Sequence, residues 1–160
     1  MSRFTLEGVA RGVARDDLYG FYIEFRGDDT EILRSVGVDP GIRSRRVRKE
    51  GDILWVDQEI LQGKRALPYH QKITLHPTDY TYDVASEIPG MMRDVRHYVF
   101  EPIPEGSRVR AQCRLEPLSG GLRFLDAIGV FKSMVRKKSM EVMDGYCRAA
   151  ESEFVGSNPG

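Results

Sequence analysis

The sequence predicts an α+β fold in which a curved, seven-stranded antiparallel sheet packs against one long C-terminal helix. Residues 42–116 consist of strand candidates that are separated by short turn signals. From about residue 120 to residue 154, apolar side chains recur at a spacing of three or four, which is typical of an amphipathic helix. The chain has 160 residues, close to the usual length of one domain, so we expect a single domain over 1–160.

The N-terminal part predicts one strand followed by two short helices. Residues 3–11 alternate roughly between polar and apolar side chains, as a half-buried strand does. Asp16 and Asp17 supply an N-cap and first-turn acids for a helix with an apolar, aromatic-rich face. A second helix is expected over 28–36, with Gly37 as its stop.

The middle of the chain predicts an antiparallel meander. Turn signals that contain Gly, Pro or Asp separate the strand candidates, and short connections join antiparallel neighbours. The last strand alternates most clearly, with Val109, Ala111, Cys113 and Leu115 on one side and mostly arginines on the other, so one face should be buried. The expected strands are 42–50, 52–62, 69–76, 79–88, 92–101 and 107–116.

Composition excludes several classes of function. Lys plus Arg number 24, as do Asp plus Glu, so no net field attracts nucleic acid or an anionic membrane. Apolar runs fall short of the roughly 18 residues that a membrane span needs, and the start of the chain lacks a signal-peptide pattern. With only two cysteines, we expect a reduced, cytoplasmic protein with no integral membrane segment. Residues 155–160 are expected to form a disordered tail.

The order of elements resembles the START-like helix-grip superfamily (SRPBCC), which includes the major birch-pollen allergen, polyketide cyclases and aromatases, and coenzyme Q-binding proteins. Residues 14–19 (ARDDLY) are similar to the start of its first helix, and residues 100–102 with 106–109 are similar to its penultimate hairpin. The helix at 122–154 resembles its lid. Tyr98 departs from the pattern, because many relatives carry Trp there.

The resemblance implies a cavity between the sheet and the C-terminal helix that accepts lipids, polyketides, sterols or quinones. It implies no catalytic residues, because the family has none in common. A strongly bent sheet cannot contact a single helix over its whole concave face, so either large side chains or a ligand must fill the remaining volume. The residues expected to line it are Tyr69, Tyr80, Tyr82 and Tyr98, which combine an apolar body with a polar tip. The alternative is that these rings only fill the core.

Cations interrupt the apolar stripe of the long helix. Lys132, Arg136 and Ser139 fall on the same face as apolar residues, and burial of an unpaired cation is costly. These residues could lie at the cavity mouth and meet an anionic or carbonyl group of a ligand. Two other interpretations stay open: this stretch overhangs the sheet in solvent, or a bend near Gly129 changes the helix phase.

No spacing typical of a metal site or cofactor motif occurs, so we expect neither. His70 and His76 share the polar face of their strand and are expected to be solvated, and no ligand partner is evident for His97. Cys113 and Cys147 lie on apolar faces and are expected to be small core residues.

Two charged groups on the strands also have two interpretations. Asp57 and Glu59 share a face with Trp55 and could perform acid–base chemistry, but exposure is favoured because the opposite parity makes an equally good core face. The basic run at 43–49 could contact phosphate, but a solvated sheet edge is favoured because aromatic residues do not alternate with the cations.

The leading hypothesis is binding or transport of an apolar or amphipathic small molecule, such as a fatty acid, a quinone or a polyketide-like aromatic. The second is an enzyme of the polyketide cyclase or dehydratase type that uses the same pocket. The third is an interaction module that acts through its surface. A polar constellation inside the pocket would favour the enzyme, and a dry pocket would favour the carrier.

Overall fold

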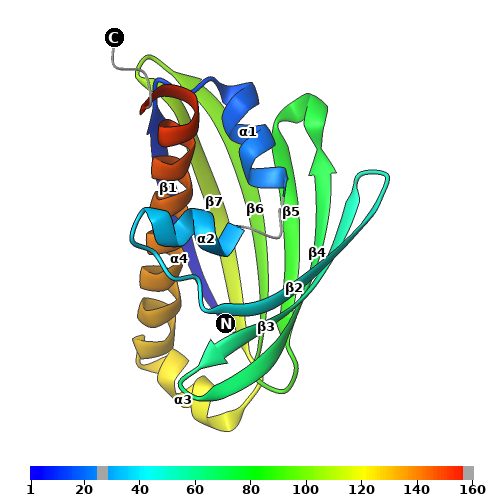
Figure 1. Cartoon of the computed structure of the whole chain (residues 1–160). Coiled ribbons are helices and arrows are strands. Elements are labelled where there is room, and N and C mark those ends of the chain that lie inside the picture. The colour runs from blue at the N-terminus through cyan, green and yellow to red at the C-terminus, as the bar shows by residue number, and fades with distance from the viewer. Residues whose placement is uncertain (25–28, 157–160) are drawn as a thin grey trace.

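The computed structural model describes residues 1–24 and 29–156. The predicted fold class is confirmed: a curved, seven-stranded antiparallel sheet surrounds a C-terminal helix (Figure 1). The elements are β1 (Ser2–Arg11), α1 (Arg15–Ile23), α2 (Asp29–Ser35), β2 (Ile42–Glu50), β3 (Ile53–Gln62), β4 (Arg65–His76), η1 (Pro77–Asp79), β5 (Thr81–Ile88), β6 (Met92–Ile103), β7 (Gly106–Pro117), α3 (Gly120–Ala127), α4 (Val130–Glu151) and η2 (Ser152–Gly156).

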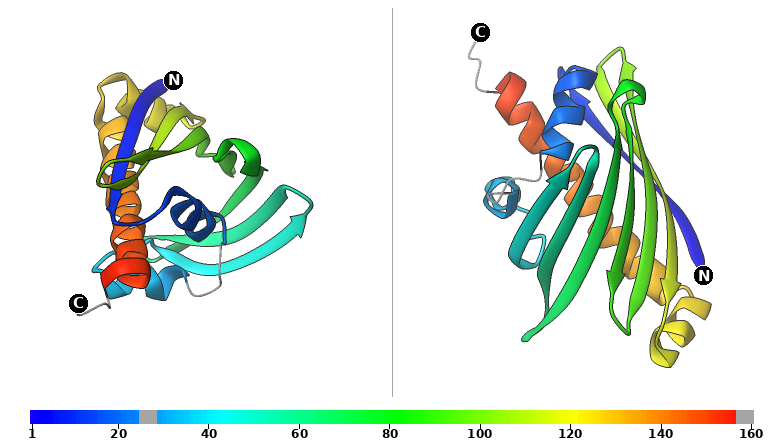
Figure 2. Two further views of the ribbon diagram at one scale, coloured as in Figure 1. Left: turned by 90° about the horizontal axis from the view of Figure 1, so that it is seen from above. Right: turned by 90° about the vertical axis from the view of Figure 1, so that its right-hand side faces the viewer.

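The sheet order is β1-β7-β6-β5-β4-β3-β2, so β1 and β2 form the two edges. β2 to β7 follow one another as the predicted meander, and β1 returns to pair with β7. The view from above in Figure 2 shows the sheet curving into a trough, with α4 along its open side next to β1, α1 within the curve and α2 beside α4. This curvature keeps most of the concave face away from the helix and leaves room for a site.

Strand alternation places the core where the sequence predicted it. On β7, the side chains of Val109, Ala111, Cys113 and Leu115 are all buried, and the arginines between them lie on the outer face. Cys147 on α4 is buried as well, and both cysteines are free thiols. Since the pleat alternates with period two, this register also decides which residues of β6 face inward.

The long helix predicted over 120–154 is two helices. Gly129 has a left-handed backbone (φ 81°) and separates α3 from α4, so of the three interpretations of the interrupted stripe, the bend is present. Glycine adopts this conformation without the Cβ clash that other residues meet. At the other end, residues 155 and 156 belong to the helical turn η2, and residues 157–160 lie outside the described part. The predicted second helix also began at residue 28, outside the described residues.

Close packing attaches α2 and α1 to α4. A Cβ at Gly145 would lie 3.0 Å from the side chains of both Leu33 and Val38, so glycine is what allows this approach. From α1, the Tyr22 hydroxyl donates a hydrogen bond to the Met143 carbonyl at 3.1 Å. No helix in the described part of the chain is long and apolar enough to cross a membrane.

Candidate functional site

A cavity of about 210 Å³ lies between the concave face of the sheet and α4. Strands β2 to β6 supply one wall, and the α4 segment from Lys138 to Tyr146 supplies the other. The apolar part of the lining includes Leu33, Ile73, Val84 and Met143. The polar part consists of Arg45, Gln58, Tyr69, Gln71, Ser86, Arg96, Tyr98, Lys138 and Ser139. The cavity is therefore amphipathic rather than dry.

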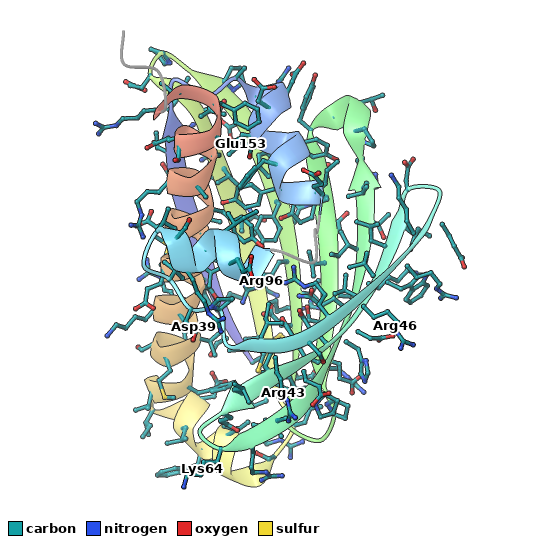
Figure 3. The ribbon with its side chains drawn as sticks, in the orientation of Figure 1. Asp39, Arg43, Arg46, Lys64, Arg96 and Glu153 are labelled. Atoms are coloured by element: carbon teal, nitrogen blue, oxygen red, sulfur yellow. The ribbon has the colours of Figure 1, made fainter. Side chains whose placement is uncertain are left out.

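Arg96 on β6 occupies the inner part of this space (Figure 3). Its Nε and Nη2 lie 2.8 and 2.7 Å from the same carboxylate oxygen, Oδ2 of Asp94. Nη2 also donates to Oγ of Ser139 on α4 at 2.9 Å. The Asp94 side chain is fully buried, and that of Arg96 is only 14% exposed. These contacts fix the guanidinium between the sheet and the helix.

The guanidinium remains charged in this environment. Burial alone would lower the pKa of Arg96, but the neighbouring Tyr98 hydroxyl and the Asp94 carboxylate together raise it well above its ordinary value. Of the five N–H donors of an arginine, the bonds to Asp94 and Ser139 use those on Nε and Nη2. The two on Nη1 take no part in these bonds, and the Tyr98 hydroxyl lies next to the guanidinium.

Three tyrosines, Tyr69, Tyr82 and Tyr98, line the cavity together with the Arg96 guanidinium. The rings of Tyr82 and Tyr98 stack with centroids 4.5 Å apart. The Tyr69 hydroxyl accepts a hydrogen bond at 3.1 Å from Gln71, which also donates to Ser86 at 3.3 Å. Burial raises the pKa of Tyr69 and of Tyr98, although Arg96 lowers both in part. Both hydroxyls are therefore protonated near neutral pH and can donate hydrogen bonds, but they are poor bases.

Cationic side chains line the cavity on β2 and on α4. The Lys138 side chain, which lines it on α4, is half-exposed and donates a hydrogen bond to the Asp39 carbonyl. From β2, Arg45 Nε donates to Oε1 of Gln58 at 3.2 Å.

The residues predicted to bind a ligand are not all brought together. Tyr69, Tyr82 and Tyr98 line the cavity, as does Ser139. Tyr80 is not among the residues that line it: it follows η1 with a left-handed backbone (φ 53°), and the Arg15 guanidinium lies 3.8 Å from its ring centroid.

Lys132 and Arg136, the two helix cations predicted near the cavity rim, are placed elsewhere. They line a separate surface depression between α4 and β1, together with Phe4 and Thr5. The α4 residues that line the cavity begin only at Lys138, so the first two turns of α4 extend past the cavity. Arg136 is exposed there and Lys132 is partly exposed, as the interpretation of a solvated overhang expected.

Sequence reasoning missed Arg96, the central cation of the cavity. One signal was available: β6 carries Asp94 and Arg96 on the same face as Tyr98 and Phe100, and Phe100 is buried. A charged pair at positions i and i+2 on a strand face that also carries buried aromatics indicates a buried ion pair. Gln58, Gln71 and Ser86 had no comparable signal, because isolated amides and hydroxyls occur on both faces of a strand.

The histidines lie on the outer face of the sheet. His70 Nδ1 is 2.8 Å from Asp57, while His76 Nε2 and His97 Nδ1 are 3.0 and 2.6 Å from the two carboxylate oxygens of Asp83. The side chains of these five residues are between 42 and 66% exposed. Within residues 1–24 and 29–156, no group of three or more His, Cys, Asp or Glu is arranged to hold a metal ion.

The two charged groups on β2 and β3 also face solvent. Asp57 and Glu59 are exposed, whereas Leu54 and Val56 on the opposite face are buried. The basic run occupies β2, an edge strand, and its side chains are mostly exposed.

Comparison with known proteins finds relatives only at the level of structure. No protein-family model matches the chain, and no curated protein matches its sequence. The Zhui aromatase/cyclase from Streptomyces sp. R1128 superposes with a TM-score of 0.74 at 10% identity over 98% of this chain and 96% of that one. The di-domain aromatase/cyclase StfQ of the steffimycin pathway gives 0.73 at 16% identity, over 94% of this chain and 51% of that one. Ara h 8.0201 gives 0.68 at 17% identity, over 98% of this chain and 99% of that one.

At these identities the likeness concerns the fold. It shows that the chain has the START-like helix-grip fold that its order of elements resembled. The structures that share it include aromatase/cyclases as well as Ara h 8.0201, so the fold is compatible with ligand binding and with cyclase chemistry and does not select between them.

Proposed function

We propose that this protein binds a compact amphipathic molecule in the cavity beneath α4, with an oxygen-bearing head group on Arg96 and an apolar body against the tyrosine and aliphatic wall. The observation that carries the proposal is the orientation of Arg96. Asp94 and Ser139 hold its guanidinium on one side at 2.7–2.9 Å, which leaves Nη1 for a ligand. A charge-assisted hydrogen bond from a largely desolvated guanidinium is stronger than one between neutral groups.

The cavity also limits the size of the ligand. Its volume is about 210 Å³, which is the volume that roughly seven water molecules occupy in liquid water. Drug-sized ligands fill pockets of roughly 300–1,000 Å³. We therefore infer a ligand with one or two rings, or a short chain, whose head is a carboxylate, a phenolate or a polarised carbonyl group.

The test compares an acid with its methyl ester. The probes are 2-naphthoic acid and methyl 2-naphthoate, and their affinities are measured by isothermal titration calorimetry. Wild type should bind the acid at least about tenfold more tightly, since a charge-assisted hydrogen bond contributes roughly 1.5–3 kcal/mol. Arg96→Met should abolish the preference. Lys132→Met/Arg136→Met removes two cations from the separate depression and should retain it.

A second variant separates binding from folding. Arg96→Met leaves the Asp94 carboxylate buried without its cation, so Asp94→Asn/Arg96→Met is measured alongside it. Equal affinity of wild type for acid and ester would contradict the proposal, as would loss of the preference in Lys132→Met/Arg136→Met.

A cyclase-type reaction is the second candidate, because Arg96 and the Tyr98 hydroxyl lie together on the cavity wall. Two donors aimed at one point can stabilise an oxyanion that develops on a carbonyl during ring closure. No carboxylate or histidine of the described residues lines the cavity, so the protein would contribute orientation and oxyanion stabilisation rather than a strong base. This candidate is consistent with the aromatase/cyclases that share the fold.

The second candidate has its own test. A short linear poly-β-ketone thioester analogue is incubated with the protein, and mass spectrometry follows the loss of water that accompanies ring closure and aromatisation. Faster conversion by wild type and by Lys132→Met/Arg136→Met, but not by Asp94→Asn/Arg96→Met, would support catalysis. Binding of the analogue without conversion would leave the carrier function.

A further inference from the structure

The elbow between α3 and α4 exposes large apolar side chains. Phe124 is 65% exposed, Ile128 57%, Val130 41% and Met134 61%. Phe124 and Ile128 are one helical turn apart, as are Val130 and Met134, so each pair forms a short apolar ridge. We call these four residues the elbow patch. Contiguous exposed apolar groups on a folded domain usually mark an interaction site.

The elbow protrudes from the body of the protein. In Figure 1, α3 lies at the lower end of the molecule, and the second view of Figure 2 shows it projecting past the ends of the strands. Ser119 caps the start of α3, where its hydroxyl accepts a hydrogen bond from the Leu122 amide at 3.2 Å. The elbow is therefore a helical structure of the described chain and not a loose loop.

Positive charge is concentrated around the elbow patch, although the whole chain is neutral. The cations are Arg123, Lys132, Arg136 and Lys137. The single acid in the same stretch is Asp126, whose side chain is only 8% exposed and accepts a hydrogen bond from the Ser2 hydroxyl. Apolar side chains flanked by lysine and arginine are typical of helices that lie in a membrane interface.

A polar depression adjoins the elbow. Lys132, Ser133, Arg136 and Lys137 line it on α4, opposite β1. These groups provide cations and a hydroxyl, the donors that bind phosphate oxygens. Glu141 and Asp144 also line it, but they lie more than one helical turn further along α4 from the elbow. The cationic half of the depression is thus the half next to the elbow patch.

We propose that the elbow patch docks this protein on the surface of an anionic lipid bilayer, with the four apolar side chains between the acyl chains and the surrounding cations at the lipid phosphates. A second copy of this chain is a less suitable occupant, because two such patches would bring like charges together. A convex protrusion also offers no groove for side chains of an acidic protein, whereas a bilayer surface adapts to it. Lys132 and Arg136, which do not line the ligand cavity, have their role in this interface.

The test is co-sedimentation with large unilamellar vesicles. One set contains phosphatidylcholine alone, and the other an equimolar mixture with phosphatidylglycerol. Wild type should partition to the anionic vesicles and detach as salt is raised. Phe124→Ser/Ile128→Ser should lower the partition coefficient by about tenfold or more, because two apolar side chains no longer insert. Lys132→Glu/Lys137→Glu should lower it by a similar factor.

Matched controls come from surface positions on strands. Val47→Ser/Val95→Ser removes two exposed apolar side chains of β2 and β6. Arg43→Glu/Arg46→Glu reverses two cations of β2, the edge of the sheet opposite β1 (Figure 3). Both controls should bind the anionic vesicles as wild type does.

Three results would overturn the proposal. The first is no binding to anionic vesicles, or equal binding to both vesicle types. The second is a loss in the control variants as large as the loss in the elbow variants. The third is a dimer in size-exclusion chromatography with light scattering that Phe124→Ser/Ile128→Ser converts to a monomer, which would identify a second copy as the occupant. None of these results depends on the ligand cavity, so the two proposals can fail separately.

Discussion

Two neighbouring residues of β6, Arg96 and His97, show how strongly position alters a contact with a carboxylate. Arg96 points into the cavity and pairs with Asp94, whose side chain is fully buried. His97 points outward and lies 2.6 Å from Asp83, whose side chain is 46% exposed. The inner face of β6 therefore carries a desolvated pair, while its outer face forms a solvated contact with β5.

The difference in solvent exposure decides which charged side chains are held in one geometry and can therefore form a binding site. On the outer face, water and salt screen the attraction, so side chains gain little by holding one geometry. On the inner face, the charges are removed from water, and each needs its partner to remain there. The inner pair therefore holds the Arg96 guanidinium in one orientation, while the outer pairs can rearrange at little cost.

The largest expected effect comes from breaking the inner pair. Asp94→Asn removes the carboxylate and leaves Arg96 as a buried, uncompensated cation. We expect the free energy of unfolding to fall by about 3–5 kcal/mol, measured by urea denaturation at neutral pH. A loss below about 1 kcal/mol would mean that this pair is solvated like the pairs on the outer face.

At high pH, the burial of the two cysteine thiols should lower the free energy of unfolding. Burial raises the pKa of the Cys147 thiol from 9.0 to about 11, an effect that its hydrogen bond with Tyr22 reduces only in part, and burial raises the pKa of Cys113 to about 11 as well. A thiol whose pKa is higher in the folded than in the unfolded state contributes its full stabilisation of the folded state below pH 9. This stability is lost as the pH rises from about 9 to 11, at most about 3 kcal/mol per thiol.

The thiol effect is measured as a difference between two proteins. Urea denaturation at several alkaline pH values compares wild type with Cys113→Ala/Cys147→Ala. The buried tyrosines titrate in both proteins, so the gap between the two curves isolates the thiols. Parallel curves between pH 9 and 11 would contradict the burial of both thiols.

A smaller effect tests the parity of β7. Cys113→Ser places a hydroxyl among buried apolar groups, where the Ala111 carbonyl oxygen is 3.9 Å from the sulfur that the hydroxyl replaces. We expect a loss of roughly 1–3 kcal/mol in the free energy of unfolding. Gln112→Ser, one position away on the exposed face, is the matched control and should change stability by no more than about 0.5 kcal/mol. Equal losses would mean that the two faces are not distinct.

The smallest effect is expected on the outer face. Asp83→Asn removes the acid that lies next to both His76 and His97. Because all three side chains are more than 40% exposed, the free energy of unfolding should change by less than about 1 kcal/mol. A loss comparable to that of Asp94→Asn would remove the distinction between the two faces of β6.

Much of the fold could be predicted from the sequence because its signals are local. Each of the strands from β2 to β7 was expected within a few residues of its observed bounds, and the buried side of β7 was predicted at Val109, Ala111, Cys113 and Leu115. Alternation with period two depends only on neighbouring residues, so the inner face of a strand can be read before its partners are known.

The helix break shows where local signals stop. The 3–4 spacing continues across Gly129, and an isolated glycine costs a helix only about 1 kcal/mol, so a single helix was the simpler prediction. The left-handed backbone at Gly129 accompanies the packing of α3 against β7 and of α4 against β1, which are contacts between distant segments.

The sequence was sufficient to predict the order of the strands and the buried face of β7, because both depend on residues close together in the chain. Of the four tyrosines expected at the cavity, Tyr80 does not line it. Which polar side chains come together in the cavity depends on contacts between distant segments, so it is known only from the tertiary structure. Arg96 and Ser139 are 43 positions apart and form a hydrogen bond because β6 lies two strands in from β1, the strand on which α4 packs. Lys132 and Arg136 lie in the first turns of α4, ahead of the segment from Lys138 that lines the cavity, and they line the depression beside β1 instead.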